Sequence, residues 1–369
     1  MVRRLLVLNG LSVICVVLYH ATAWGYTAMF WWTHRYMAVS VPNFDQMGSP
    51  AYFVLRLIEQ AVIFAIPSFI FVSGFFIAVA TRRDQRTIEW RIVLTRIKNL
   101  LIPFAFWSIL ILAAGWIQGQ RYSPGEMVIV FITGRTAAPY YYVPLLVQLL
   151  LIAPVLVPLA RNRAGLLLIV TGIIQIFVLL LRYVQIIGWE IPELKPLMFL
   201  NRSWLFTTYV FWFSFGIVAG FHLQQVKNVL NRLKNSFPVL MVIFFILGVI
   251  EWEYLLRLSG QEWIGPSETL IDQVYSGAVI LGFLLFEKFN PPLAAQLADL
   301  GGKSYGVYLV HAPVLEYSAR LIYHILPGIL AYEALFQPAL IVLGLGIPLV
   351  LMAAINRSPA RMLYKTVFG

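Results

Sequence analysis

The most constraining feature of this chain is a series of ten apolar segments, each long enough to cross a lipid bilayer as a helix. A helix needs about 20 mostly apolar residues to span a hydrocarbon core of about 30 Å. Only helices and closed barrels satisfy their backbone hydrogen bonds inside lipid. We therefore predict an all-α fold, a polytopic membrane helix bundle of about ten transmembrane helices. The segments lie at approximately 5–24, 60–80, 99–118, 141–160, 165–183, 204–224, 237–256, 269–286, 303–324 and 336–356.

Composition excludes several other classes of protein. The 369 residues are 60% hydrophobic and only 12% charged, whereas an ordinary soluble domain is about 25% charged. A single cysteine, Cys15, rules out an intramolecular disulfide and a cysteine-built metal cage. We find no phosphate-binding glycine-rich loop, no metal motif and no nucleophile elbow. We therefore expect no bound metal.

The charge distribution predicts the orientation of the helices. With the N-terminus in the cytoplasm, 18 of the 27 Lys and Arg fall in inner loops and nine outside. Such a bias is typical of membrane proteins, so the net charge of +11 indicates membrane lipids rather than nucleic acid as the partner. We predict that both termini are cytoplasmic. No polar stretch is long enough to fold alone, so residues 1–369 are predicted to form a single integral-membrane domain.

Polar residues inside the predicted spans are the candidates for chemistry, because they are costly in a bilayer. His20 lies in the outer half of the first span, and Asn9, eleven residues earlier, shares its helix face. A histidine there either packs against a neighbouring helix or acts as a general base. His311, in the ninth span, is placed nearer the cytoplasm, so we expect the two histidines to line one channel without forming a hydrogen-bonded pair.

The inner loop 81–98 is strongly basic and includes Arg83, Arg86, Arg96 and Lys98. It serves either as a positive-inside anchor on anionic lipid or as a phosphate clamp, since arginine binds phosphate through two parallel hydrogen bonds. Further polar residues have structural alternatives: Glu59 orients a histidine or simply pairs with Arg56, and the others bind a ligand or pack helices. These possible supporting residues are Asn9, Glu59, Ser73, Tyr142 and Gln148.

Five segments together resemble the acyltransferase-3 family of polytopic membrane acyltransferases, of the sugar O-acetyltransferase type. They are LNGLSVICVVLYHA (8–21), FIFVSGFFIAVA (69–80), RIKNLLIPFAFWSI (96–109), YYYVPLLVQLLLIAPVL (140–156) and LGGKSYGVYLVHAPVL (300–315). The family's first helix carries an arginine, ten residues and a catalytic histidine. His20 matches the histidine, whereas Asn9 stands at the arginine position. Arg83 and Arg86 fit the family's Arg-x-x-Arg motif, with Arg82 as an alternative register.

The resemblance implies transfer of an acyl group, most often acetyl, from cytoplasmic acyl-CoA to a hydroxyl of a cell-surface or exported glycan. His20 would be the general base, and the basic loop with His311 would contact the acyl donor. The family implies acetyl-CoA or another acyl-CoA as co-substrate, no permanently bound cofactor, and a bacterial inner membrane. Two alternatives stay open: a transporter or flippase for a lipid-linked saccharide, and a non-catalytic family member, because Asn9 replaces the motif arginine.

Overall fold

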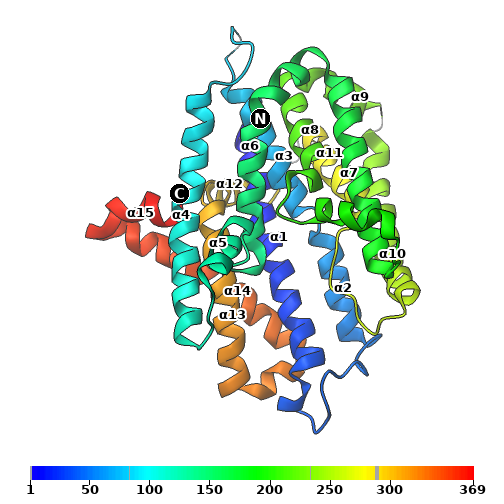
Figure 1. The fold of residues 1–369 in the computed structure, drawn as a ribbon, viewed down its shortest axis with the longest axis vertical. Coiled ribbons are helices and arrows are strands. Elements are labelled where there is room, and N and C mark those ends of the chain that lie inside the picture. The colour runs from blue at the N-terminus through cyan, green and yellow to red at the C-terminus, as the bar shows by residue number, and fades with distance from the viewer. Residues whose placement is uncertain (1, 83, 233, 287–290) are drawn as a thin grey trace.

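The computed structural model describes residues 2–82, 84–232, 234–286 and 291–369, and these residues form helices joined by loops, without a strand (Figure 1). The α-helices are α1 (Val2–Tyr26), α2 (Pro50–Val62), α3 (Ala65–Ala80), α4 (Trp90–Ile117), α5 (Pro124–Thr133), α6 (Tyr142–Asn162), α7 (Ala164–Ile187), α8 (Val210–Phe221), α9 (Leu223–Asn231), α10 (Phe237–Ser259), α11 (Leu270–Leu285), α12 (Ala294–Gly302), α13 (Ser304–Ile325), α14 (Glu333–Arg357) and α15 (Tyr364–Phe368). The prediction of an all-α polytopic bundle is confirmed.

Every predicted span coincides with a helix, although several boundaries differ. Seven helical stretches in the described ranges are long and apolar enough to cross a membrane: α1, α2 with α3, α4, α6, α7, α10 and α14. The other three predicted spans correspond to α8, α11 and α13. The span predicted at 60–80 begins earlier, at Pro50, and is divided between α2 and α3. The span predicted at 204–224 is helical as α8 only from Val210.

The loops gather at the two ends of the bundle in the alternating order that the sequence predicts. At one end, Arg161 donates to the backbone oxygens of Arg82 and Gln85, and a ring nitrogen of His222 lies 3.0 Å from the carbonyl oxygen of Ala160. This end holds the connection between α3 and α4, at the top of Figure 1. At the other end, Arg35 donates to the carbonyl of Tyr323. Which end faces the cytoplasm, and whether the chain is a single domain, stay predictions.

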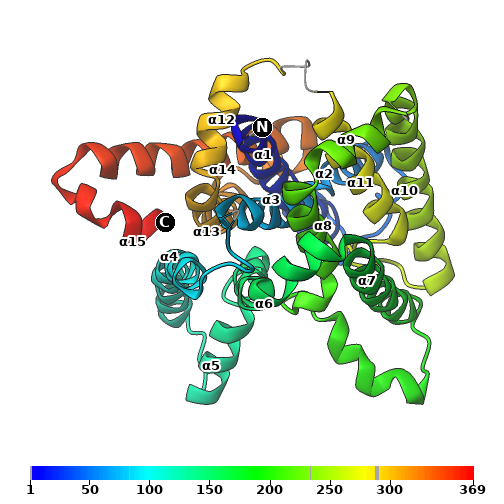
Figure 2. The same cartoon turned by 90° about the horizontal axis from the view of Figure 1, so that it is seen from above.

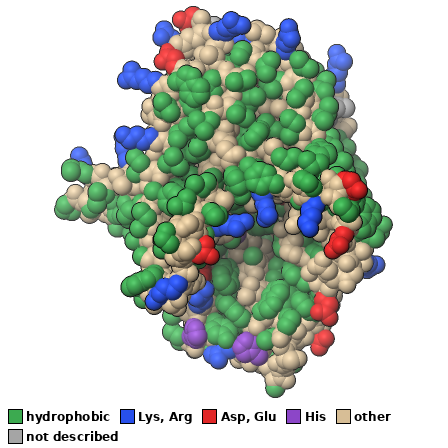
Figure 3. All heavy atoms as spheres, viewed as in Figure 1, with side chains coloured by type: hydrophobic (Ala, Val, Ile, Leu, Met, Phe, Trp, Pro, Cys, Tyr) green, Lys and Arg blue, Asp and Glu red, His purple; other side chains and the backbone are tan. Residues whose placement is uncertain are grey.

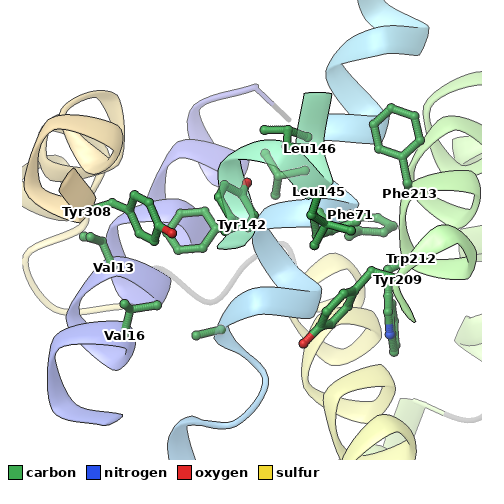
Figure 4. Close-up of a cluster of buried hydrophobic side chains, with 14 of the residues drawn as sticks. Val13, Val16, Phe71, Tyr142, Leu145, Leu146, Tyr209, Trp212, Phe213 and Tyr308 are labelled. Atoms are coloured by element: carbon green, nitrogen blue, oxygen red, sulfur yellow. The ribbon is translucent and has the colours of Figure 1, made fainter. Parts of the chain in front are cut away.

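A core of buried side chains runs through the middle of the bundle. Viewed from above, α1, α3 and α8 lie centrally, with α4, α7, α10 and α14 around them (Figure 2). Figure 4 shows Val13 and Val16 of α1 facing the rings of Tyr142 from α6 and Tyr308 from α13. The centroids of these two tyrosine rings are 5.3 Å apart. The face of α1 that carries the candidate residues therefore points into the bundle.

Glycines let pairs of helices approach backbone to backbone. Gly74 of α3 and Gly216 of α8 each face the other helix so closely that an added Cβ would collide with a backbone oxygen. Gly10 of α1 and Gly301 of α12 meet in the same way. Small residues at such crossings are typical of helix packing in membranes.

A side chain at the crossing of α3 and α8 should destabilise the protein. We expect Gly74→Ala to lower the free energy of unfolding by about 1–3 kcal/mol, because overpacking forces the two backbones apart. Gly346→Ala on α14 is the matched control, since a Cβ there meets no atom within 4 Å. The thermal unfolding midpoints of both variants in detergent test this. Equal midpoints would contradict the close packing.

Candidate active site

Two histidines from distant parts of the sequence meet at the centre of the site. The imidazole centroids of His20 on α1 and His311 on α13 lie 5.3 Å apart. His311 is fully buried, whereas His20 is partly exposed. The prediction that they lie at different depths is therefore wrong. Gly10 of α1 packs against Gly301 near the end of α12, and α13 begins three residues later at Ser304, so this contact places the start of α13 near the level of Gly10.

The hydrogen bond of His311 determines where its proton lies. Nδ1 is 2.5 Å from the backbone oxygen of Tyr308. A carbonyl oxygen only accepts, so Nδ1 carries the hydrogen in the neutral ring, and Nε2 has a free lone pair. Nε2 has no hydrogen-bond partner among the described residues. An unpaired buried acceptor is rare in proteins, and this one belongs to the ring beside His20.

His20 lines a cavity of about 1040 Å³. The other lining residues come from α1, from the α2–α3 junction, from the end of α7 and from three segments, around 133–141, 198–209 and 261–268. Figure 3 shows the molecule hollowed below its middle, with Lys and Arg side chains along the upper edge. The sequence places these three segments on the outer side. Ligand cavities typically have about 300–1,000 Å³, so this one has room for a sugar-sized molecule and an acyl group.

Tyrosines fix one wall of the cavity to the helix that carries His311. Tyr308 donates to the carbonyl of Pro139, which lines the cavity. Tyr140 donates in return to the carbonyl of Leu309, at 2.5 Å. These reciprocal bonds hold the turn before α6 against α13. This part of the cavity wall is therefore attached by hydrogen bonds to the helix that carries His311.

An ion pair braces another part of the cavity wall. Arg182, near the end of α7, donates to the backbone oxygen of Glu268 at 3.2 Å and lies 3.9 Å from its carboxylate. Tyr209 and Gln273 donate to the same carboxylate, at 2.5 and 2.8 Å. Burial raises the pKa of the Glu268 carboxyl, and Arg182 opposes that rise. The next turn begins α11, where Thr269 and Asp272 cap each other reciprocally.

Glu59 does not contact His20. Its carboxylate accepts hydrogen bonds from Arg56 and, at 3.5 Å, from the hydroxyl of Tyr26. It is 4% exposed and does not line the cavity. Of the two interpretations drawn from the sequence, the structure shows the pair with Arg56.

The other supporting candidates have structural partners. Gln148 donates to the carbonyls of Pro144 and Trp204 and accepts from the amide of Phe206, so it holds the loop before α8 beside the cavity. Ser73 precedes Gly74 on α3, and the ring of Tyr142 packs against that of Tyr308 inside the bundle. Neither Gln148 nor Tyr142 lines the cavity.

Asn9 lies on the inward face of α1, away from the cavity. Asn9, Val16 and His20 fall on one side of the helix, separated by seven and four residues. The side-chain oxygen of Asn9 and the hydroxyl of the neighbouring Ser12 are buried and have no hydrogen-bond partner in the described part of the chain. A polar stripe therefore leads from His20 along α1 toward the end that holds the α3–α4 connection.

The donor-side candidates lie around that connection. Arg86 and Lys98 are exposed, and neither makes a side-chain hydrogen bond or ion pair with another described residue. Arg96 is half-buried and donates to the carbonyl of Phe76 at 3.1 Å. Arg83 lies outside the described residues. Arg161 was not singled out from the sequence, yet it holds the loop through the backbone of Arg82 and Gln85.

Sequence reasoning missed most of the cavity. Besides His20, the charged and aromatic residues that line it are Tyr19, Arg135, Tyr141, Arg182, Arg202, Trp204, Tyr209 and Glu268. One signal was present: three of the nine Lys and Arg predicted outside line this single cavity. Within the ranges that the structure describes, no three His, Cys, Asp or Glu side chains are grouped so as to hold a metal ion.

Comparison with known proteins identifies the family. No curated protein and no solved structure matches the chain. The acyltransferase-3 family model, described as an acyltransferase domain, matches residues 5–357, nearly the whole chain. The match includes both histidines and every cavity-lining residue. The chain therefore belongs to the acyltransferase-3 family and is an integral membrane acyltransferase.

Proposed function

We propose that the protein transfers an acetyl group from cytoplasmic acetyl-CoA to a hydroxyl of a cell-surface or exported glycan, in a bacterial inner membrane. The observation that carries this proposal is the position of His20. Its ring lines a large cavity between loops that the sequence places outside, and it contacts the buried ring of His311, whose Nε2 has no hydrogen-bond partner among the described residues. A base at the inner limit of such a cavity is suited to meet a hydroxyl arriving from the outer side.

The reaction requires one proton transfer to the base and one away from it. His20 takes the proton of the acceptor hydroxyl, and the oxygen attacks the thioester carbonyl carbon. The carbon–sulfur bond then breaks, and the thiolate of CoA takes a proton from the imidazolium. His311 assists by accepting a hydrogen bond at Nε2 from His20, which would fix the tautomer that leaves the other His20 nitrogen free for the hydroxyl. Catalytic hydrogen bonds often tighten only when substrate is bound.

The cavity lining supports a glycan as the acceptor. Tyr19, Tyr141, Trp204 and Tyr209 offer aromatic faces together with hydroxyl or N–H groups. Such side chains present an apolar body and a polar tip, which suits a sugar ring with its alternating C–H and hydroxyl surfaces. The cavity is large enough to bind a sugar unit without burying a whole polymer.

The opposite end of the bundle supports a donor that enters from the cytoplasm. Arg86 and Lys98 lie exposed there, free to bind phosphate groups. The buried polar atoms of Asn9 and Ser12 lie between that end and His20, and they would pair with the amide groups of the pantetheine arm. Asn9 would thus replace a charged motif residue with a neutral hydrogen-bonding one.

Removal of Arg86 should weaken donor binding. We expect Arg86→Ala to raise the dissociation constant of acetyl-CoA about tenfold, because it removes charge-assisted hydrogen bonds to phosphate. Arg163→Ala is the matched control, since Arg163 is also exposed at this end. The measurement uses purified protein in detergent with radiolabelled acetyl-CoA and follows bound label and thioester loss.

The same experiment tests the proposed function as a whole. Wild type should consume the thioester. No donor binding and no consumption by wild type, beside an active control acyltransferase, would favour the transporter or the non-catalytic alternative. Equal donor affinity of Arg86→Ala and Arg163→Ala would assign the basic loop to lipid anchoring instead.

A further inference from the structure

The cavity around His20 carries an excess of positive charge. Its charged lining residues are three arginines, Arg135, Arg182 and Arg202, against one carboxylate, Glu268. Positive charge is unusual on the side of a membrane protein that is predicted to face outward. Three arginines from three separate segments therefore require an explanation.

Only one of these arginines is used to hold the structure. Arg182 is 13% exposed and is bound to Asn201 and Glu268. Arg135 and Arg202 are exposed, and their guanidinium groups make no hydrogen bond or ion pair with any residue that the structure describes. Two unpaired guanidinium groups at one cavity bind oxyanions well, because each offers paired N–H donors.

We infer that the acceptor carries an anionic group, a carboxylate or a phosphate, that Arg135 and Arg202 bind while its hydroxyl faces His20. This inference rests on the proposed function and specifies its acceptor class. The cationic rim also raises the local concentration of an anionic acceptor and speeds its association. A neutral glycan would accept hydrogen bonds from the guanidinium groups but would leave their positive charges without a counter-ion.

The position of the arginines favours the acceptor over the donor as the source of the anion. Arg135 and Arg202 lie on loops predicted outside, whereas acyl-CoA is expected from the end that holds Arg86. The phosphates of CoA are nevertheless oxyanions too, so the test must separate the two substrates.

The experiment measures anion binding by calorimetry on purified full-length protein in detergent. The probes are methyl glucuronide for a carboxylate, inorganic pyrophosphate for a phosphate, and methyl glucoside as the neutral comparison, each with saturating acetyl-CoA present. The proteins are wild type, Arg135→Gln/Arg202→Gln, and Arg257→Gln. Arg257 is a suitable control because it is exposed and predicted outside, yet does not line the cavity.

We expect at least one anion to bind wild type and Arg257→Gln equally, and to bind the double variant at least about tenfold more weakly. Acetyl-CoA affinity should be the same in all three proteins. The anion that responds identifies the acidic group. An Arg135→Lys/Arg202→Lys variant should retain part of the binding, because lysine keeps the positive charge but lacks the paired N–H donors of the guanidinium group. Unfolding midpoints confirm that the variants are folded.

Three results would overturn the inference: neither anion binds more tightly than methyl glucoside, the double variant binds anions as wild type does, or it loses acetyl-CoA binding as well. The last result would assign the arginines to the donor. Failure of the proposed function gives a different pattern, in which wild type consumes no thioester but anion binding still depends on Arg135 and Arg202.

Discussion

Replacement of His20 by alanine should lower the rate of acyl transfer about 10²–10⁴-fold while acetyl-CoA affinity stays nearly unchanged. General-base catalysis contributes a factor of this size, and the basic residues predicted to bind the donor lie at the far end of the bundle. Turnover of acetyl-CoA with an acceptor, measured beside equilibrium binding of the donor, separates the two effects. His324→Ala is the matched control, because His324 is exposed and lies outside the cavity.

A double variant of His20 and His311 tests whether the two histidines act together. If His20 and His311 act as one unit, the double alanine variant should lose little more activity than His20→Ala alone, since such effects are not additive. A full rate in His20→Ala would place the base elsewhere. Losses that multiply would show that the two rings act independently, despite the 5.3 Å between their centroids.

This result also bears on the residue that departs from the family pattern. Asn9 lies on the His20 face of α1 but does not line the cavity. If wild type is active and depends on His20, a neutral amide at this position is compatible with catalysis. If wild type binds acetyl-CoA and does not consume it, the missing positive charge at Asn9 becomes the first explanation for a non-catalytic member.

The sequence predicted the helices well, because hydropathy alone selects membrane-spanning segments. It predicted relative depth poorly. We placed His20 and His311 by counting from the predicted cytoplasmic start of each span, as if all spans began in one plane. The helices instead take their relative positions from packing, and the contact of Gly10 with Gly301 places the start of α13 near the level of Gly10. Such a contact joins residues almost 300 positions apart and has no local sequence signal.

The cavity shows the same limit of prediction from sequence. His20 was predicted from its cost inside a bilayer and from the family motif. Arg135, Arg182 and Arg202 come from loops whose spatial proximity is decided by tertiary contacts, such as that between Arg182 and Glu268. Each alone is one more charge in a polar loop. Only their convergence on one cavity gives them a chemical meaning.

Removal of the arginine from the buried pair on α2 should be the most damaging change to stability. We expect Arg56→Met to lower the free energy of unfolding by about 3–5 kcal/mol, because it leaves the carboxylate of Glu59 buried without its partner. Arg56 and Glu59 are 3% and 4% exposed. The Arg56 guanidinium also lies 4.4 Å from the ring centroid of Trp252, a cation–π contact that the variant removes.

A double variant separates two contributions to the free energy of unfolding: the cost of leaving Glu59 buried without a partner, and the net contribution of the ion pair itself. Arg56→Met/Glu59→Gln should be markedly more stable than Arg56→Met alone, because replacing a buried pair with uncharged residues is far less costly than breaking it. Unfolding of both variants in detergent, beside Arg257→Met, measures the difference. Arg56→Met as stable as Arg257→Met would contradict a buried ion pair.

Glu59→Gln should keep acyl-transfer activity, because Glu59 is bound to Arg56 rather than to His20. A loss of activity as large as that of His20→Ala, in a Glu59→Gln protein whose unfolding midpoint shows that it is folded, would instead revive the alternative in which this carboxylate orients the base.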